Sequence, residues 1–140
     1  VPYNSVVFCP LDGYVYKLGK ETEKGNYGGY LILKHKIKNQ IFYSLYGHLK
    51  TPHKVRLGDK VCSGQKLARI GKESDSGGWF CHLHLQVITQ KAMNEGYSEW
   101  GYISEKLLSN VEDYFPNPNF LFKYPYISSS FNSATFIKGE

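Results

Sequence analysis

Apolar and polar residues alternate along one short run of the chain, Cys81-His82-Leu83-His84-Leu85-Gln86-Val87. Successive side chains of an extended strand point to opposite faces, so His82, His84 and Gln86 would share one face and the leucines the other. The two imidazoles would then lie about 7 Å apart, twice the rise per residue of a strand. That spacing lets both serve one site, as two ligands or as a ligand and a proton carrier. Taken alone, the pattern also describes two solvent-facing histidines on a half-buried strand.

The composition predicts a single globular domain rich in strands and turns. The chain has 140 residues, with 12 Tyr, 8 Phe, 14 Gly and only one Met, a balance that favours strands over helices. No apolar stretch approaches the roughly 18–20 residues that a membrane helix needs, so no membrane span is predicted. The net charge of +5 comes from scattered lysines, which indicates a solvated basic surface. No aromatic-interleaved RNA-binding motif is present, and we predict no nucleic-acid partner.

The three cysteines do not form a recognisable framework. Cys9, Cys62 and Cys81 are widely separated and include no C-x-x-C pair, so at most one disulfide could form. Cys81 stands beside His82, as a nucleophile stands beside its base in some hydrolases. Adjacent strand residues point to opposite faces, however, and we therefore interpret Cys81 as a buried small residue.

The first half of the chain predicts two β-hairpins. Ser5–Cys9 and Tyr14–Leu18 flank a Pro-Leu-Asp-Gly turn, which is typical of a hairpin. Tyr30–Ile37 and Ile41–Leu49 alternate in polarity around a short polar turn and form the strongest hairpin signal in the sequence. Glycines then recur at short intervals through Val55–Gly71, a pattern that suits a compact β-sandwich or partly closed barrel.

Three further histidines differ in their surroundings. His35 lies among aliphatic residues and is interpreted as a core or rim histidine. His48 ends a predicted strand, on the face of Phe42 and Tyr46, where the chain can open toward a cleft; packing and chemistry both remain open for it. His53 lies in a polar loop and is expected to be solvated.

The last third of the chain changes in character. Ser104–Tyr114 predicts a short helix with Ser104 as its N-cap and an apolar stripe, ended by Pro116-Asn117-Pro118. Residues from Ser128 onward are rich in Ser and Asn and are expected to be loose.

Five motifs follow one another in a definite order: Pro10-Leu11-Asp12-Gly13-Tyr14-Val15, Tyr46-Gly47-His48-Leu49, Gly58-Asp59-x-Val61-x-x-Gly64-Gln65, Ile70-Gly71 and Gly77-Gly78-x-x-x-His82-Leu83-His84-Leu85. Together they resemble the lysostaphin-type zinc metallopeptidase family over roughly residues 1–88. The resemblance implies an all-β fold: a compact antiparallel β-sandwich or partly open barrel of the duplicated hybrid motif kind, with a short C-terminal helix and an irregular tail. Leu45–Leu49, Gly77-Gly78-Trp79 and Pro116–Asn119 are most similar to a variant found joined to kinase-like and aminotransferase domains, and this resemblance implies fusion to further domains upstream.

The resemblance also implies a set of site residues. In this family three protein ligands hold one zinc and leave a position for water and substrate. The second His of His-x-His is a ligand, which corresponds to His84. His82 and His48 correspond to histidines beside the bound water, which orient or deprotonate it and stabilise the tetrahedral intermediate. The implied substrates are peptide bonds, typically those of bacterial peptidoglycan.

The family's other two zinc ligands come from a His-x-x-x-Asp motif just before the segment that corresponds to Val1-Pro2-Tyr3. We expect the parent gene to encode this motif immediately upstream, and the 140-residue piece alone to bind zinc poorly and to be inactive. Asp12 and Asp75 are poor substitutes, because the first belongs to a turn motif and the second to a polar loop.

Residues 1–88 are therefore expected to form the metallopeptidase-like β core, incomplete at its N-terminus, with residues 89–127 as an extension that packs on it and residues 128–140 as a loose tail. Two other functions stay open. One is a metal-free, degenerate copy that acts as a binding or regulatory module in a multidomain protein. The other is a phosphate- or group-carrier domain, which glycine-punctuated segments like Gly58–Gly71 also resemble. The localisation is left open: cell envelope or secreted for a peptidoglycan hydrolase, cytoplasmic for the aminotransferase-fused variant.

Overall fold

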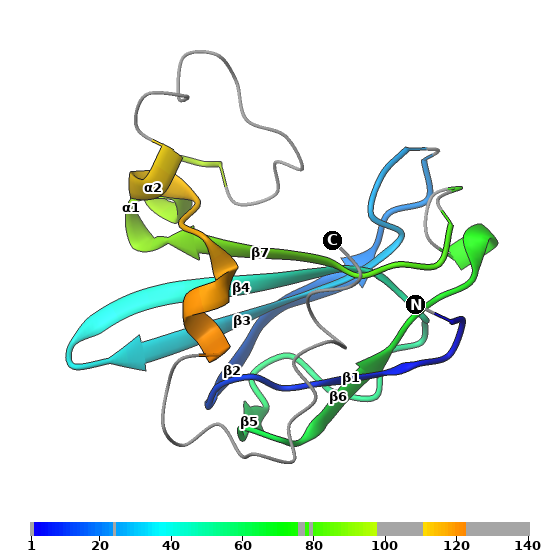
Figure 1. The fold of residues 1–140 in the computed structure, drawn as a ribbon, viewed down its shortest axis with the longest axis horizontal. Helices are drawn as coiled ribbons and strands as arrows, with labels where there is room; N and C mark the ends of the chain where they lie inside the picture. The colour runs from blue at the N-terminus through cyan, green and yellow to red at the C-terminus, as the bar shows by residue number, and fades with distance from the viewer. Residues whose placement is uncertain (1, 24, 76–77, 79, 98–110, 123–140) are drawn as a thin grey trace.

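The computed structural model describes residues 2–23, 25–75, 78, 80–97 and 111–122, which form two open antiparallel sheets and a few short helices (Figure 1). The larger sheet has the strand order β5-β2-β3-β4-β7, and the smaller one pairs β1 with β6. The strands are β1 (Val6–Phe8), β2 (Gly13–Lys20), β3 (Gly29–Ile37), β4 (Gln40–Leu49), β5 (Lys60–Val61), β6 (Lys66–Arg69) and β7 (His84–Thr89). The helical segments are η1 (Glu73–Asp75), α1 (Gln90–Asn94), α2 (Val111–Tyr114) and η3 (Pro118–Phe122). This architecture confirms the predicted all-β fold with short helices.

The β3–β4 hairpin forms as the alternating pattern predicts. Ile37 pairs with Gln40, and the two residues between them, Lys38 and Asn39, have φ angles of 49° and 68°. Two consecutive left-handed residues make the kind of tight turn whose twist matches that of a right-twisted strand pair. The hairpin places β4 next to β7, with which it also pairs.

The predicted hairpin between Ser5–Cys9 and Tyr14–Leu18 is wrong. β1 pairs with β6, with Val7 opposite Ala68, whereas β2 pairs with β3 and β5. The turn between β1 and β2 carries the chain from the small sheet to the large one instead of folding it back. Asp12 Oδ1 fixes this turn by accepting a hydrogen bond of 2.7 Å from the backbone N–H of Ser63, which lies far away in the sequence. The turn residues therefore predicted the change of chain direction correctly, but they did not predict which strand pairs with β1.

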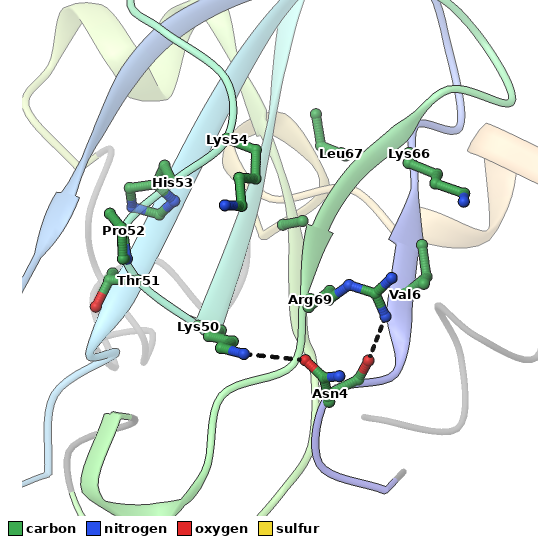
Figure 2. Close-up of a pocket in the computed structure, with 11 residues that line it drawn as sticks. Asn4, Val6, Lys50, Thr51, Pro52, His53, Lys54, Lys66, Leu67 and Arg69 are labelled. Carbon is green, nitrogen blue, oxygen red and sulfur yellow. Dashed lines mark hydrogen bonds between the residues drawn. The ribbon is translucent and has the colours of Figure 1, made fainter.

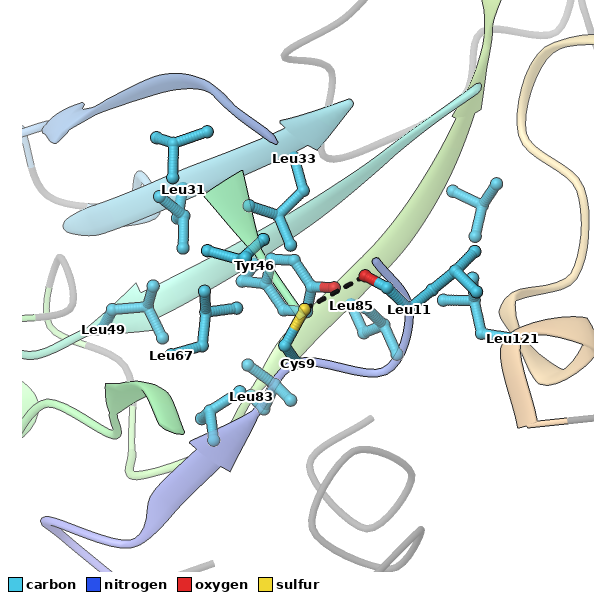
Figure 3. Packing of buried hydrophobic residues seen from close by; sticks show 14 of the residues in the cluster. Cys9, Leu11, Leu31, Leu33, Tyr46, Leu49, Leu67, Leu83, Leu85 and Leu121 are labelled. Carbon is cyan, nitrogen blue, oxygen red and sulfur yellow. Dashed lines mark hydrogen bonds between the residues drawn. The ribbon is translucent and has the colours of Figure 1, made fainter. Parts of the chain in front are cut away.

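The main core lies on the face of the large sheet that the β1–β6 pair covers, and Figure 3 shows its packing. Leucines from most strands meet there around the fully buried ring of Tyr46. Cys9 is part of this core, and its burial raises the pKa of the thiol to about 12. The core residues are Val7, Cys9, Leu11, Val15, Leu31, Leu33, Phe42, Tyr46, Leu49, Val61, Leu67, Ile70, Leu83, Leu85, Val87 and Leu121.

The opposite face of the large sheet carries a second apolar cluster, made by Tyr27, Ile32, Tyr43, Leu45, Ile88, Ala92 and Tyr114. α1 and α2 cover this cluster near the end of β7. Thr89 caps α1 by accepting from the backbone N–H of Ala92, and its hydroxyl donates to the carbonyl of Asp113 in α2. Because both faces are covered, β3 and β4 are buried on both sides over most of their length.

His35 is a core histidine, as its aliphatic neighbours predict, and is 1% exposed. Its Nδ1 donates to the carbonyl of Asp12 at 2.8 Å, so its Nε2 accepts from the hydroxyl of Ser44 at 2.7 Å. The hydroxyl of Tyr46 in turn donates to Ser44 at 2.8 Å. This buried chain of hydrogen bonds ties the turn before β2 to β3 and β4. Burial lowers the pKa of His35 to about 4.

His53 and Cys81 are both half-buried, whereas the sequence predicted a solvated His53 and a buried Cys81. His53 is half-buried and not simply solvated, because its Nε2 donates to the carbonyl of Gly19 at 2.8 Å. Cys81 is half-buried, and Cys9, Cys62 and Cys81 are all free thiols.

The C-terminal predictions fall partly outside the described residues. Of the predicted helix Ser104–Tyr114, the described part is α2, and residues 98–110 are not described. The tail from Ser128 also lies outside the described residues. In the part of the chain that the structure covers, no helix has the length and apolar character required to cross a membrane.

Candidate active site

A bulge near the end of β4 determines where His48 points. Between the pairs Leu31–Tyr46 and Gly29–Leu49, β4 has one residue more than β3, and His48 adopts a φ of 63°. A bulge interrupts the alternation of a strand and re-aims its side chains. Leu49 thus joins Tyr46 in the main core, although odd and even positions should face opposite sides.

His48 consequently does not lie on the face of Phe42 and Tyr46, as strict alternation predicts. Its ring lies instead beside Tyr27, which belongs to the cluster on the opposite face, with ring centroids 6.0 Å apart. The side chain is nevertheless well enclosed, at 4% exposed. The sequence-based prediction failed here because it could not include the extra residue.

The structure brings the three predicted site histidines together. The ring centroid of His48 lies 4.1 Å from that of His82 and 6.2 Å from that of His84. His82 precedes β7, which begins at His84, so the predicted strand starts later than expected. The alternation itself holds, since Leu83, Leu85 and Val87 are buried while His82 and His84 are half-buried.

Two local hydrogen bonds set the tautomers of the neutral rings. His82 Nδ1 donates to the carbonyl of Phe80 at 2.7 Å, and His84 Nε2 donates to Gln86 Oε1 at 3.0 Å. The proton on one ring nitrogen puts the lone pair on the other, so the lone pair is on Nε2 in neutral His82 and on Nδ1 in neutral His84. Burial, and then the nearby His82, lower the pKa of His84, with Gln86 acting in the opposite direction. Burial thus favours the neutral form of His84, the form that metal ligation requires.

Tyr27 is a site residue that the sequence did not single out. Its ring centroid lies 4.9 Å from that of His84, and its carbonyl accepts from the backbone N–H of His48 at 2.8 Å. Gly47 lets this ring come close, because a Cβ at that position would stand 2.7 Å from Tyr27 Cδ1. The available signal was a single tyrosine within the otherwise polar, glycine-rich segment 19–29.

Phe80 is a second residue that sequence reasoning left aside. Its side chain is 70% exposed, and its ring centroid lies 4.7 Å from that of His82. An exposed aromatic ring beside a half-buried imidazole offers an apolar contact to a ligand. The ring stands where a molecule that approaches His82 would meet it.

Of the predicted zinc ligands, the structure describes His84, and it lies in the histidine cluster. His84, with Nδ1 presented and Nε2 held by Gln86, has the arrangement of a metal-ligating histidine and its supporting hydrogen-bond partner. Asp12 is engaged in its turn with Ser63, and the side chain of Asp75 is not described. Among the described residues there is no group of three or more His, Cys, Asp or Glu side chains able to hold a metal ion.

Comparisons with known proteins returned one family model and matching solved structures. The family model described as Peptidase family M23 matches residues 1–95. The catalytic domain of the antimicrobial peptidase lysostaphin from Staphylococcus simulans, crystallized in the absence of phosphate, superposes with a TM-score of 0.59 at 18% identity, over 89% of this chain and 74% of that one. LytU superposes with a TM-score of 0.58 at 20% identity, over 89% and 70% of the two chains. At these identities the two structures show the fold alone. The search of curated proteins returned no match.

Proposed function

Because this chain belongs to peptidase family M23, we propose that its histidine cluster hydrolyses peptide bonds with the help of a zinc ion. Membership confirms the family that the five sequence motifs resemble, and the β-rich fold agrees with it. The observation that carries the proposal is the approach of three histidines from two separate segments, with His48 and His82 rings 4.1 Å apart.

His84 is the proposed metal ligand, through Nδ1. Gln86 keeps the proton of this ring on Nε2 and so fixes both the tautomer and the ring orientation. A catalytic zinc site needs two further protein ligands, and the described residues hold no group of three that could supply the full set. A zinc ion held in this way supplies Lewis-acid chemistry, which polarises a carbonyl and lowers the pKa of water.

His82 and His48 are the proposed acid–base groups. The carbonyl of Phe80 holds the proton of neutral His82 on Nδ1, so Nε2 can accept a proton from the attacking water. His82 can then give this proton to the leaving amine nitrogen as the bond between that nitrogen and the carbonyl carbon breaks. His48, enclosed and next to His82, can orient the water and donate a hydrogen bond to the tetrahedral intermediate. Tyr27 positions both His48 and His84 through its ring and its backbone carbonyl.

We propose peptide bonds of bacterial peptidoglycan as the substrate. The proposal follows from the family and from the exposed ring of Phe80 beside His82, which offers an apolar contact to an approaching peptide or sugar.

The test uses the full-length protein, purified with zinc, and follows the release of peptide fragments from peptidoglycan by mass spectrometry. We expect His48→Ala and His82→Ala each to lower the rate about a hundredfold or more, as loss of an acid–base group does. His84→Ala should also lower the zinc content. His53→Ala is the matched control, because His53 bonds to Gly19 outside the cluster, and its rate should not change.

Hydrolysis that survives both His48→Ala and His82→Ala would refute the proposed roles. Stoichiometric substrate binding by the wild-type protein without any hydrolysis or zinc would instead favour the alternative, a metal-free copy of the fold that acts as a binding or regulatory module.

A further inference from the structure

A cavity of about 500 Å³ lies between the end of β4, the loop that follows it and β6. Figure 2 shows Lys50 and Lys54 on one side of this opening and Lys66 and Arg69 on the other. None of the residues that line it is Asp or Glu. We propose that this basic cavity binds a small phosphorylated molecule, independently of the peptidase reaction.

Asn4 holds two of the four cations at the cavity. Its side-chain oxygen accepts from Lys50 Nζ at 3.3 Å, and its carbonyl accepts from Arg69 Nη1 at 2.9 Å. Asn4 is itself fixed, because its backbone N–H donates to the carbonyl of Ile70 at 2.9 Å. A guanidinium has five N–H donors, so Arg69 keeps donors for a ligand after this contact. The cavity thus has a pre-positioned arginine and not only mobile surface lysines.

The four cations around the basic cavity repel one another unless an anion lies between them. Among the described residues, none of the four cations forms an ion pair with a carboxylate. A single carboxylate ligand would bring one negative charge, whereas a phosphomonoester brings nearly two, with three strong acceptor oxygens. Arginine binds phosphate oxygens bidentately, and lysines add point charges around them. Phosphate therefore matches this set better than a carboxylate does.

The rest of the wall indicates an organic group attached to the phosphate. Val6, Pro52, Leu67 and Ala68 line the cavity together with the cations. The volume is far larger than one phosphate ion requires and falls within the range of pockets for small ligands, about 300–1,000 Å³. A phosphomonoester of sugar or glycerol size would place its phosphate at Arg69 and its carbon skeleton against the apolar residues.

The experiment is a calorimetric titration of the 140-residue chain with inorganic phosphate, with glycerol 3-phosphate and with a short single-stranded oligonucleotide. We expect saturable binding of both phosphates, tighter for glycerol 3-phosphate, and weaker binding as salt rises. The double variant Lys54→Gln/Lys66→Gln should weaken binding about tenfold. Arg69→Lys should weaken it several-fold although the charge is kept, because lysine lacks the paired N–H donors with which a guanidinium binds phosphate.

Lys36→Gln is the matched control, because Lys36 is exposed and does not line this cavity. Thermal melting of each variant checks that the fold is kept; Lys54 and Lys66 are exposed and suit this purpose. Three results would overturn the proposal: no saturable phosphate binding, an equal loss in Lys36→Gln, or an oligonucleotide that binds more tightly than the phosphomonoester through the same residues.

Discussion

The ring of His48 lies 4.1 Å from the ring of His82 because β4 carries one extra residue just before its end. Without that residue, His48 would face the side of the sheet occupied by Tyr46. The bulge requires a left-handed backbone at His48, with φ of 63°. This conformation is unfavourable for any residue with a Cβ, so the site is built on local backbone strain.

His48→Gly should therefore separate stability from activity. We expect His48→Gly to be more stable than His48→Ala by about 1 kcal/mol, because glycine adopts a positive φ without steric cost. Both variants should lose activity to the same extent, about a hundredfold or more, because both lack the imidazole. Urea unfolding of the two variants measures the difference, and equal stabilities would show that the backbone at this position is not strained.

Gly47→Ala should disturb the site more than the fold. An added Cβ would lie 2.7 Å from Tyr27 Cδ1 and 3.2 Å from the Cβ of His84, so the tyrosine ring and β7 must shift. We expect a drop in activity of about a hundredfold from such misplacement, with a loss of stability of roughly 1–3 kcal/mol. Gly19→Ala is the comparison, because its Cβ would meet only the flexible end of Tyr30. Full activity in Gly47→Ala would contradict the packing role of Tyr27.

Gln86→Leu should allow His84 to adopt both neutral tautomers instead of one. In the native protein Gln86 Oε1 accepts from Nε2, which leaves the lone pair on Nδ1. Nitrogen NMR of the imidazole should report one tautomer in the wild type and a mixture in the variant. Zinc affinity of the full-length protein should fall by about ten- to a hundredfold, as it does when such supporting groups are lost. An unchanged tautomer in Gln86→Leu would show that Gln86 does not control this ring.

Stability should fall in mild acid because of His35. Burial lowers the pKa of this histidine from 6.5 to about 4, so the unfolded chain binds the proton more readily than the folded one. The contribution of neutral His35 to the free energy of unfolding is complete above about pH 6.5 and is lost as the pH falls toward 4. Between pH 7 and pH 5 the loss is about 2 kcal/mol. Urea unfolding of the wild type and of His35→Gln at both pH values measures this loss of stability, and His53→Gln is the control. An undiminished pH dependence of stability in His35→Gln would disprove the assignment to His35.

Phe80→Ala tests the proposed substrate contact. The ring is 70% exposed, so its removal should leave the melting temperature nearly unchanged. We expect KM to rise about tenfold with little change in kcat, because the contact is present both before and during the reaction. Leu57→Ala, at 67% exposed, is the control for loss of an exposed apolar side chain. A large fall in kcat at constant KM would indicate that Phe80 acts through His82 instead.

The sequence predicts the structural features that depend on local periodicity. It does not predict the features that depend on contacts between segments far apart in the chain. The alternation around His82 and His84 gave the buried leucines correctly, and the β3–β4 hairpin followed from its own pattern. The pairing of β1 with β6 depends on residues near 7 and 68 that share no local signal. The orientation of His48 depends on a mismatch in length between two strands, which no single strand reveals.

The motifs carried the prediction of the family, and the contacts around them came only from the structure. Tyr27 touches His48 and His84 from a loop without strand periodicity, so its only sequence signal was that it is the single tyrosine of that loop. Gln86 was predicted to share the face of His84, but its hydrogen bond to that ring required coordinates.

The left-handed backbone at position 48 also limits what this position can hold. Glycine would adopt the conformation without steric cost, but it would leave the cluster without its third imidazole. At this position the backbone and the chemistry therefore favour different amino acids.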